Sequence, residues 1–239
     1  MEGIAAFLSP APRLPECRGL PGRTESLSDL QSIAAYHRTV VEDGQQLIGW
    51  QPVTESLNDE SGNPRWLSHA DGSKIDVAAL PVAPTYEIKL HPLPLALAQT
   101  NLFAGVGETV SIVGYPLGIT GGGAFPIWKT GHIASEPEID REDLPVFLVD
   151  ATTRRGMSGS PVYRRFHGLG WRTRRGTEMM DSRTVRAGSS ELTRFMGVYA
   201  GRRVHRTESE DGEVIEEFAE LGRVWKPHVI EQILEARSS

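Results

Sequence analysis

The chain has 239 residues, a mass of 26.2 kDa and a formal net charge of −6, which allows one large domain or two small ones around a sizeable core. Hydrophobic residues make up 39% of it, and 25 Gly with 16 Pro indicate many turns, which excludes a helical bundle. No stretch approaches the roughly 18 apolar residues of a membrane span. The negative charge gives no general reason to expect nucleic acid as a partner.

The first residues do not have the pattern of an export signal. Glu2 is acidic and no basic residue precedes the short apolar stretch that follows it, so we expect a cytoplasmic protein. Cys17 is the only cysteine, which excludes an internal disulfide and agrees with a reducing compartment. Residues 1–30 are rich in Pro, Gly and Ser and show neither period, so an irregular lead-in is expected there.

A hairpin is the first element expected along the chain. One strand reads SIAAYHRTVV (residues 32–41), the turn EDGQ (42–45) follows, and the second strand reads LIGWQPV (47–53). A further apolar run, KIDVAALPVAP (74–84), contains one acid, Asp76. Burying that carboxylate costs several kcal/mol unless it is paired or hydrogen-bonded. Asp76 therefore either has a partner or is an exposed acid at a surface turn.

More short strands follow, separated by turn signals. They are ETVSIVGYPLG (108–118), AFPIWKTGHIAS (124–135), LPVFLVDA (144–151), SPVY (160–163), RFMGVYAGR (194–202) and ELGRVW (220–225). This spacing predicts an all-β sandwich or barrel. The tail from 226 to 239 places apolar residues on one face of a C-terminal helix of about three turns.

The charge is unevenly distributed over the second half. Between Arg154 and Arg206 there are 13 Arg, no Lys and three acids, a balance of 13 − 3 = +10, and seven acids follow between Glu208 and Glu220. We interpret residues 164–193 as a solvated Arg-rich excursion beside an acidic hairpin. A nucleic-acid contact is the weaker interpretation, and nucleic acid is not an expected partner.

The stretch DATTRRGMSGSPVY (150–163) places the small nucleophile Ser158 between two glycines. A serine hydroxyl attacks a carbonyl only when a base takes its proton, and the oxyanion formed needs preorganised donors. Gly156 lets the backbone turn so that N–H groups face one point, and Gly159 keeps the approach open. The alternative is an ordinary Gly/Ser turn.

GMSGSP (156–161), with IDVAALPV (75–82) upstream and FMGVYAGR (195–202) downstream, resembles the trypsin-like serine peptidases. Within that family the stretch is most similar to the bacterial branch without disulfides, the Deg/HtrA proteases and glutamyl endopeptidases. The resemblance runs from about Ala34 to Trp225. It implies two Greek-key β-barrels in a peptidase domain over 31–239, with part of the first barrel at 31–100, the second at 101–225 and the helix at 226–239.

The same resemblance implies roles for individual residues. Ser158 would be the nucleophile, with the amides of Gly156 and Ser158 as the oxyanion hole. Asp76 would orient the catalytic imidazole. The substrate pocket would be formed by Thr152 near its base and by Gly197, Val198 and Tyr199 in its wall. The expected function is a serine endopeptidase that cuts polypeptides through an acyl-enzyme at Ser158.

The sequence does not identify which histidine would act as the catalytic base of such a site. Only His37 and His69 precede Asp76, and His69 is too near to it in sequence. His37 follows IAAY but lies in the predicted hairpin. Either His37 serves, or the histidine is absent through N-terminal truncation or degeneration, and the protein then binds a protein segment in its cleft without cutting it.

No cofactor is expected. The remaining motifs include no phosphate-cradling glycine loop, so a nucleotide is not indicated. No metal is expected either, because His132, His167, His205 and His228 lack a ligand spacing.

Overall fold

The computed structural model describes residues 4–8, 31–42, 45–81, 93–122, 125–167, 170–173, 176–179, 191–208 and 214–238. The chain packs as two compact units. The first comprises Met1–Leu93, Gly121–Phe125 and Ile230–Ser239, and the second comprises Pro94–Thr120 and Pro126–Val229. The predicted domain boundaries stay a prediction, and each unit is described by itself.

The first unit contains the expected hairpin. Strands β2 (Gln31–Glu42) and β3 (Gln45–Ser56) pair antiparallel along their whole length, and His37 lies opposite Trp50. β-Branched residues, among them Thr39, Val40 and Val41 in β2 and Val53 and Thr54 in β3, favour the strand conformation. The two strands are thus confirmed, whereas residues 43–44 at the centre of the predicted turn lie outside the described residues.

A three-stranded sheet in the first unit corrects one expectation. Its order is β1-β5-β4, formed by β1 (Ile4–Leu8), β5 (Ala78–Pro81) and β4 (Leu67–Ser68). Irregular structure was expected throughout 1–30, but Ile4–Leu8 is a strand. This short stretch could not be predicted as a strand from its own residues. It pairs antiparallel with β5, about seventy residues further along the chain, and that pairing makes it a strand.

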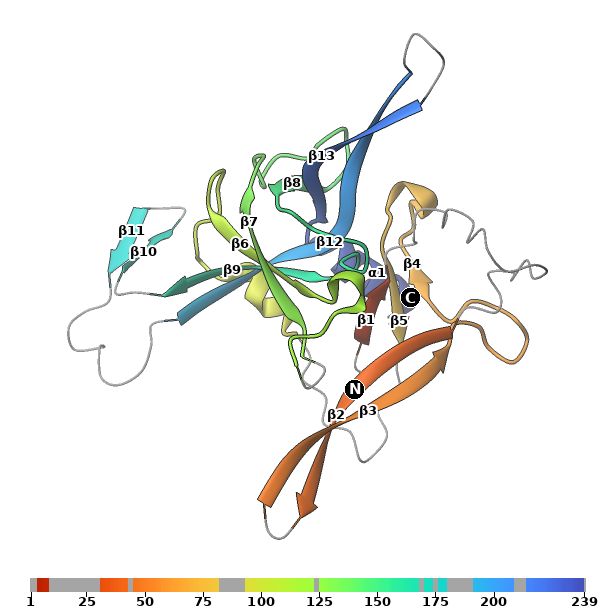
Figure 1. Cartoon of the computed structure of the whole chain (residues 1–239). Coiled ribbons are helices and arrows are strands. Elements are labelled where there is room, and N and C mark those ends of the chain that lie inside the picture. The colour runs from red at the N-terminus through yellow and green to blue at the C-terminus, as the bar shows by residue number, and fades with distance from the viewer. Residues whose placement is uncertain are drawn as a thin grey trace. The chain divides into compact units, whose positions relative to one another are not determined.

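The second unit is a closed antiparallel barrel, with the strand order β12-β13-β8-β7-β6-β9 (Figure 1). Its strands are β6 (Thr109–Gly114), β7 (Ile127–Ile133), β8 (Val146–Asp150), β9 (Pro161–His167), β12 (Glu191–Glu208) and β13 (Val214–Trp225). Closure pairs every barrel strand on both sides. The barrel confirms the all-β fold class, and α1 (His228–Ser238), the one α-helix among the described residues, confirms the expected C-terminal helix.

The barrel is filled by side chains that alternate along its strands. In β6 the side chains of Val110 and Ile112 are buried, whereas Ser111 and Val113 are not. β8 is buried at four successive positions, which explains its continuous apolar sequence. The core cluster also holds residues from the connections and from β12: Ala104, Ala151, Met157, Met196 and Tyr199.

Much of the Arg-rich segment is strand rather than excursion. β9 continues to His167, β12 begins at Glu191, and the two pair over this length, with Thr193 opposite Arg165. Between them lies a short hairpin of β10 (Gly170–Thr173) and β11 (Gly176–Met179). The sequence interpretation missed these strands because the high charge of the segment suggested a solvated loop. Arginine is compatible with a strand when an acidic side chain neutralises it. Arg164 pairs with Glu108, and Arg194 lies 3.7 Å from Glu138.

Three short 3₁₀ turns complete the described elements: η2 (Gly72–Lys74), η3 (Leu95–Gln99) and η4 (Pro116–Gly118). In the part of the chain that the structure describes, no helix has the length and apolar character that a membrane crossing requires.

Candidate active site

Two successive turns form the loop between β8 and β9. The Met157 N–H donates to the Arg154 carbonyl (3.3 Å), and the Ser160 N–H donates to the Met157 carbonyl (3.0 Å). The third residue of each turn is a glycine with positive φ, +89° at Gly156 and +86° at Gly159. That pattern is typical of type II turns, which require glycine there. Ser158 consequently stands exposed at the second position of the second turn.

Two carbonyl groups of this loop accept backbone hydrogen bonds, and these bonds fix the directions of the Gly156 and Ser158 N–H groups. The Arg155 carbonyl accepts from Leu117 N–H (2.6 Å), and the Met157 carbonyl accepts from Ser160. In a trans peptide the N–H points away from the carbonyl. The N–H groups of Gly156 and Ser158 are therefore directed away from those bonds, and neither donates to another described residue. Two N–H groups without an acceptor, in the same loop as an exposed hydroxyl, have the chemistry of an oxyanion site.

The turn that holds Arg155 is unusual. The Gly118 N–H donates to the Tyr115 carbonyl (3.0 Å), and Leu117, at the third position of this turn, has φ +56° and ψ +23°. Left-handed backbone is disfavoured for a residue with a side chain. The conformation is retained where it presents the Leu117 N–H to the serine loop, so the connection between β6 and β7 fixes the peptide that carries the Gly156 donor.

The serine loop also docks on β12. The Gly159 N–H donates to the Tyr199 carbonyl (2.8 Å), and the Tyr199 N–H donates to the Ser160 carbonyl (2.9 Å). A Cβ added to Gly201 would lie 3.5 Å from Ser158 Oγ. Residues 197–201, expected from the resemblance to line the substrate pocket, thus run directly beside the hydroxyl. Any larger side chain at 201 would reduce the room around it.

The sequence interpretation missed Thr153. Thr152 is exposed, whereas its neighbour Thr153 is only 1% exposed and its hydroxyl hydrogen-bonds the Tyr199 hydroxyl, which is equally buried. This pair joins the connection after β8 to β12. The signal was present as the doublet of threonines, but which one faces inward depends on the turn that follows.

Asp76 belongs to the first unit and Ser158 to the second. The Asp76 side chain is half-buried, and its neighbours Ile75 and Val77, which directly precede β5, are both buried. It takes part in a polar interaction. The alternative of a fully exposed acid on a surface turn does not fit this position.

Both ring nitrogens of His69 have hydrogen-bond partners within the first unit. The Asp71 N–H donates to His69 Nδ1 (3.1 Å), so Nδ1 carries no proton, and Nε2 lies 3.0 Å from Gln232 Oε1, which can only accept. A catalytic imidazole needs the opposite arrangement, with a proton on Nδ1 toward an acid and a free Nε2 toward the serine. His37 lies in β2, opposite Trp50.

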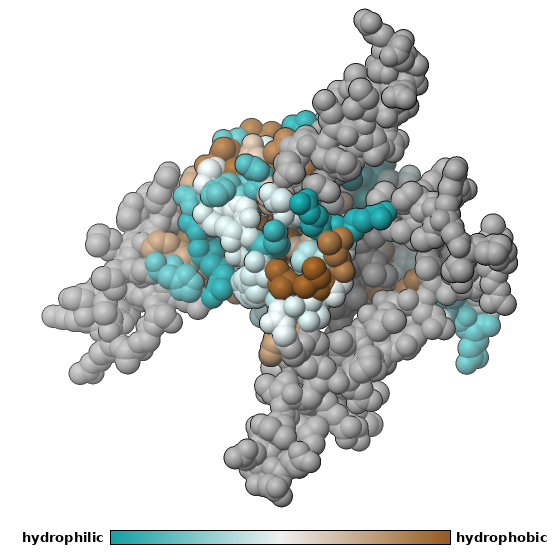
Figure 2. Space-filling view, viewed as in Figure 1, coloured by the Kyte–Doolittle hydropathy of each residue, from teal (hydrophilic) through white to brown (hydrophobic). Residues whose placement is uncertain are grey.

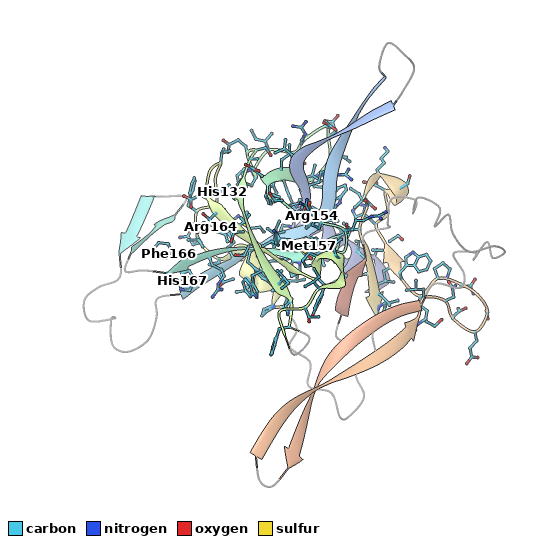
Figure 3. The ribbon with its side chains drawn as sticks, viewed as in Figure 1. His132, Arg154, Met157, Arg164, Phe166 and His167 are labelled. Carbon is cyan, nitrogen blue, oxygen red and sulfur yellow. The ribbon has the colours of Figure 1, made fainter. Side chains whose placement is uncertain are left out.

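The loop is anchored through Met157, whose side chain is fully buried in the barrel core. Figure 3 labels it beside Arg154, in agreement with the hydrogen bond between the two backbones. Arg154 and Arg155 themselves are exposed. The loop is therefore held in the core by Met157. The charged residues before it and Ser158 after it are exposed.

A family model for the trypsin-like peptidase domain matches residues 37–168, which is 132 of the 239 residues of the chain. The chain belongs to this family. The match includes both Asp76 and the serine loop, and the closed barrel is the architecture that the trypsin-like resemblance implied. As a trypsin-like peptidase domain, the protein has a serine-protease type of fold, which is consistent with polypeptide substrates. A search of curated proteins found no match.

Proposed function

We propose that the protein is a serine endopeptidase that hydrolyses peptide bonds through an acyl-enzyme at Ser158. The observation that carries the proposal is the exposed Ser158 hydroxyl in a loop whose Gly156 and Ser158 N–H groups have no acceptor among the described residues. A hydroxyl on its own is common on protein surfaces. A hydroxyl beside two preorganised donors is the arrangement that acyl transfer requires.

The reaction follows from these groups. A base takes the Ser158 proton as Oγ bonds to the carbonyl carbon of the substrate, and the carbonyl oxygen becomes an oxyanion that the two N–H groups stabilise. Collapse breaks the C–N bond, the base returns the proton to the leaving amine, and water then hydrolyses the acyl-enzyme by the same steps. Loss of one such donor lowers kcat by about 10²–10³ in enzymes of this chemistry.

Asp76 orients the base in this proposal, and Thr152, Gly197, Val198 and Tyr199 contact the substrate. The likeness of GMSGSP and IDVAALPV to the Deg/HtrA and glutamyl-endopeptidase branch supports these assignments. An Asp76→Asn change then lowers the rate by orders of magnitude, because it destabilises the imidazolium that forms during attack.

The second candidate is a domain that keeps the cleft and lacks the base. The tautomer of His69 favours it, because that ring cannot accept the serine proton while Nε2 serves Gln232. His37 is then the one remaining histidine before Asp76. Without a base, the protein would bind a polypeptide along β12 and release it uncut.

Labelling with a fluorophosphonate, read by peptide mass, separates the two candidates. The chain is expected to be labelled at Ser158 and the Ser158→Ala variant to be unlabelled with unchanged thermal unfolding, since the hydroxyl is exposed and contributes little to packing. His37→Ala should lose labelling, and His69→Ala, the matched control, should keep it.

A folded chain that is not labelled contradicts the peptidase proposal and supports the binding domain. Labelling that survives His37→Ala and fails in His69→Ala contradicts the tautomer described above. Full hydrolytic activity in Ser158→Ala rules out Ser158 as the nucleophile.

A further inference from the structure

The connection that contains η4 exposes apolar side chains beside the serine loop. Leu117 is 61% exposed, Ile119 is 55% exposed, and Tyr115 is exposed as well; these three residues are called the η4 patch. Figure 2 shows a hydrophobic patch on the face where Figure 3 labels Arg154 and Met157 of the serine loop. Surface turns are usually built from polar residues and glycine. Exposed apolar side chains gathered in one turn therefore indicate a binding surface.

The backbone at Leu117 is unfavourable for a leucine. Its φ of +56° and ψ of +23° are left-handed, a conformation that glycine and asparagine adopt more readily. The Leu117 side chain makes little packing contact that would offset this strain, since most of its surface is exposed. Asparagine at this position would suit both the backbone and the solvent. A leucine is therefore expected here only where a bound ligand contacts it.

Backbone contacts fix the η4 patch against the serine loop. The Leu117 N–H donates to the Arg155 carbonyl (2.6 Å). A Cβ added to Gly156 would overlap the Tyr115 carbonyl and would lie 3.3 Å from the Leu117 nitrogen. The patch therefore lies next to the peptide that carries the Gly156 donor.

The η4 patch and β12 contact opposite ends of the serine loop. The η4 backbone contacts residues 155–156, whereas the Tyr199 backbone bonds residues 159–160. In the proposed function, the substrate residues before the scissile bond lie along β12, where residues 197–199 are expected to form the pocket. The residues after that bond then leave over η4. Two extended residues span about 7 Å, so the first two side chains after the scissile bond can reach the patch.

We infer that the η4 patch is a subsite for the leaving-group side of the polypeptide, and that the protein selects chains with a large aliphatic or aromatic side chain at one of the first two residues after the scissile bond. The inference rests on the proposed function, which places that bond at Ser158. Leu117 and Ile119 determine specificity and take no part in proton transfer. An apolar side chain is the matching partner because the contact removes apolar surface of both molecules from water.

Binding without hydrolysis tests the subsite separately from catalysis. The Ser158→Ala chain is titrated with two fluorescent peptides that are identical except for two successive central residues, which are Leu in one and Ser in the other. The Leu peptide should bind about three- to tenfold more tightly, because each side chain is only partly covered by the patch. Raising NaCl from about 0.05 M to about 0.5 M should leave this difference unchanged, since salt screens charges.

Variants in the Ser158→Ala background assign the effect to the η4 patch. Leu117→Asn with Ile119→Thr should abolish the preference, since asparagine tolerates the left-handed backbone and threonine keeps the β-branched shape. Ile119→Thr alone leaves the left-handed residue unchanged and should lose part of the preference. The matched control is Ile139→Thr, which changes a similarly exposed residue in the β7–β8 connection at the other end of the barrel and should keep the preference. Thermal unfolding of each variant checks that it is folded.

Cleavage by the wild-type chain assigns the side of the scissile bond. In a digest of synthetic peptides of random sequence, read by product mass, large apolar residues should be enriched about threefold or more at the first two positions after the cut. The enrichment should disappear in the variant with Leu117→Asn and Ile119→Thr.

Equal binding of the two peptides, binding of neither, or a preference that persists in the double variant overturns the inference. Cleavage without apolar enrichment after the cut also overturns it and leaves the peptidase proposal intact. An apolar preference that the double variant removes, in a chain that neither cuts peptides nor is labelled at Ser158, upholds the patch as a binding site and overturns the peptidase proposal. The two failures are therefore distinguishable.

Discussion

Gly156 is restricted both by its backbone conformation and by its surroundings. Its φ of +89° is open to glycine and costs other residues about 1–2 kcal/mol. A Cβ at this position would also overlap the Tyr115 carbonyl. The backbone of the neighbouring turn cannot move aside without disturbing Leu117, which holds the same peptide.

A Gly156→Ala variant is therefore expected to lose stability and to lose labelling of Ser158, because the donor N–H would shift with the turn. Gly62→Ala is the matched control, since Gly62 has a similar φ of +83° with nothing within 4 Å of a new Cβ. Denaturant unfolding should show a loss of about 1 kcal/mol at Gly62 and a larger one at Gly156. Equal losses with labelling retained would contradict the steric argument.

The connection after β8 and strand β12 form one assembly. The backbone exchange between the serine loop and Tyr199 is reinforced by the buried hydroxyl pair of Thr153 and Tyr199. Removing one buried hydroxyl leaves the other without that partner, which costs about 1–3 kcal/mol.

A double-mutant cycle with Thr153→Val and Tyr199→Phe tests this assembly. Each single change should lower the free energy of unfolding, and the double variant should lose less than the sum, with a coupling of about 1 kcal/mol or more. The same variants should reduce the rate of Ser158 labelling, because the loop docks on Tyr199. Additive losses would indicate that the two hydroxyl groups act independently.

Elements with a complete local signal were predictable from the sequence. The hairpin of β2 and β3, the strands β6 to β8 and the helix α1 have apolar stretches bounded by turn residues, and each is confirmed. β1 was missed because its order comes from a distant partner.

Within the site, sequence reasoning predicted Ser158 and its glycines as a turn, and the structure has two. It could not reveal Leu117 or Thr153, because the role of each arises from a contact with another connection or strand. The roles assigned to Asp76, Thr152, Gly156, Ser158 and residues 197–199 all stay predictions.

At the scale of the whole molecule, we expect a tyrosine in the barrel wall to contribute to the response to high pH. Tyr163 in β9 stacks on Trp128, with ring centroids 6.4 Å apart, and lies 6.0 Å from the Phe195 ring. Burial raises the pKa of the Tyr163 hydroxyl above its ordinary value of 10.0. Burial likewise raises the pKa of Tyr115. The folded chain therefore keeps these protons at a pH where the unfolded chain releases them.

The free energy of unfolding should consequently be constant as pH approaches 10.0 and fall as pH rises above it, because the unfolded state then binds fewer protons than the folded state. Denaturant unfolding of the wild-type chain and Tyr163→Phe across this range checks the sign. The variant should show a shallower decline. An identical slope in both would assign the alkaline destabilisation to other groups.

The hydrogen bond between Leu117 and Arg155 has a practical consequence for engineering this protein. It makes residues 115–118 and 154–160 a single cassette, although they are about forty positions apart in the chain. In a library that randomises the serine loop alone, residues 115–118 would stay unchanged and would no longer fit many of the new loop conformations. Grafting both segments together onto another scaffold transfers the donor geometry. Grafting the serine loop alone transfers its sequence without that geometry.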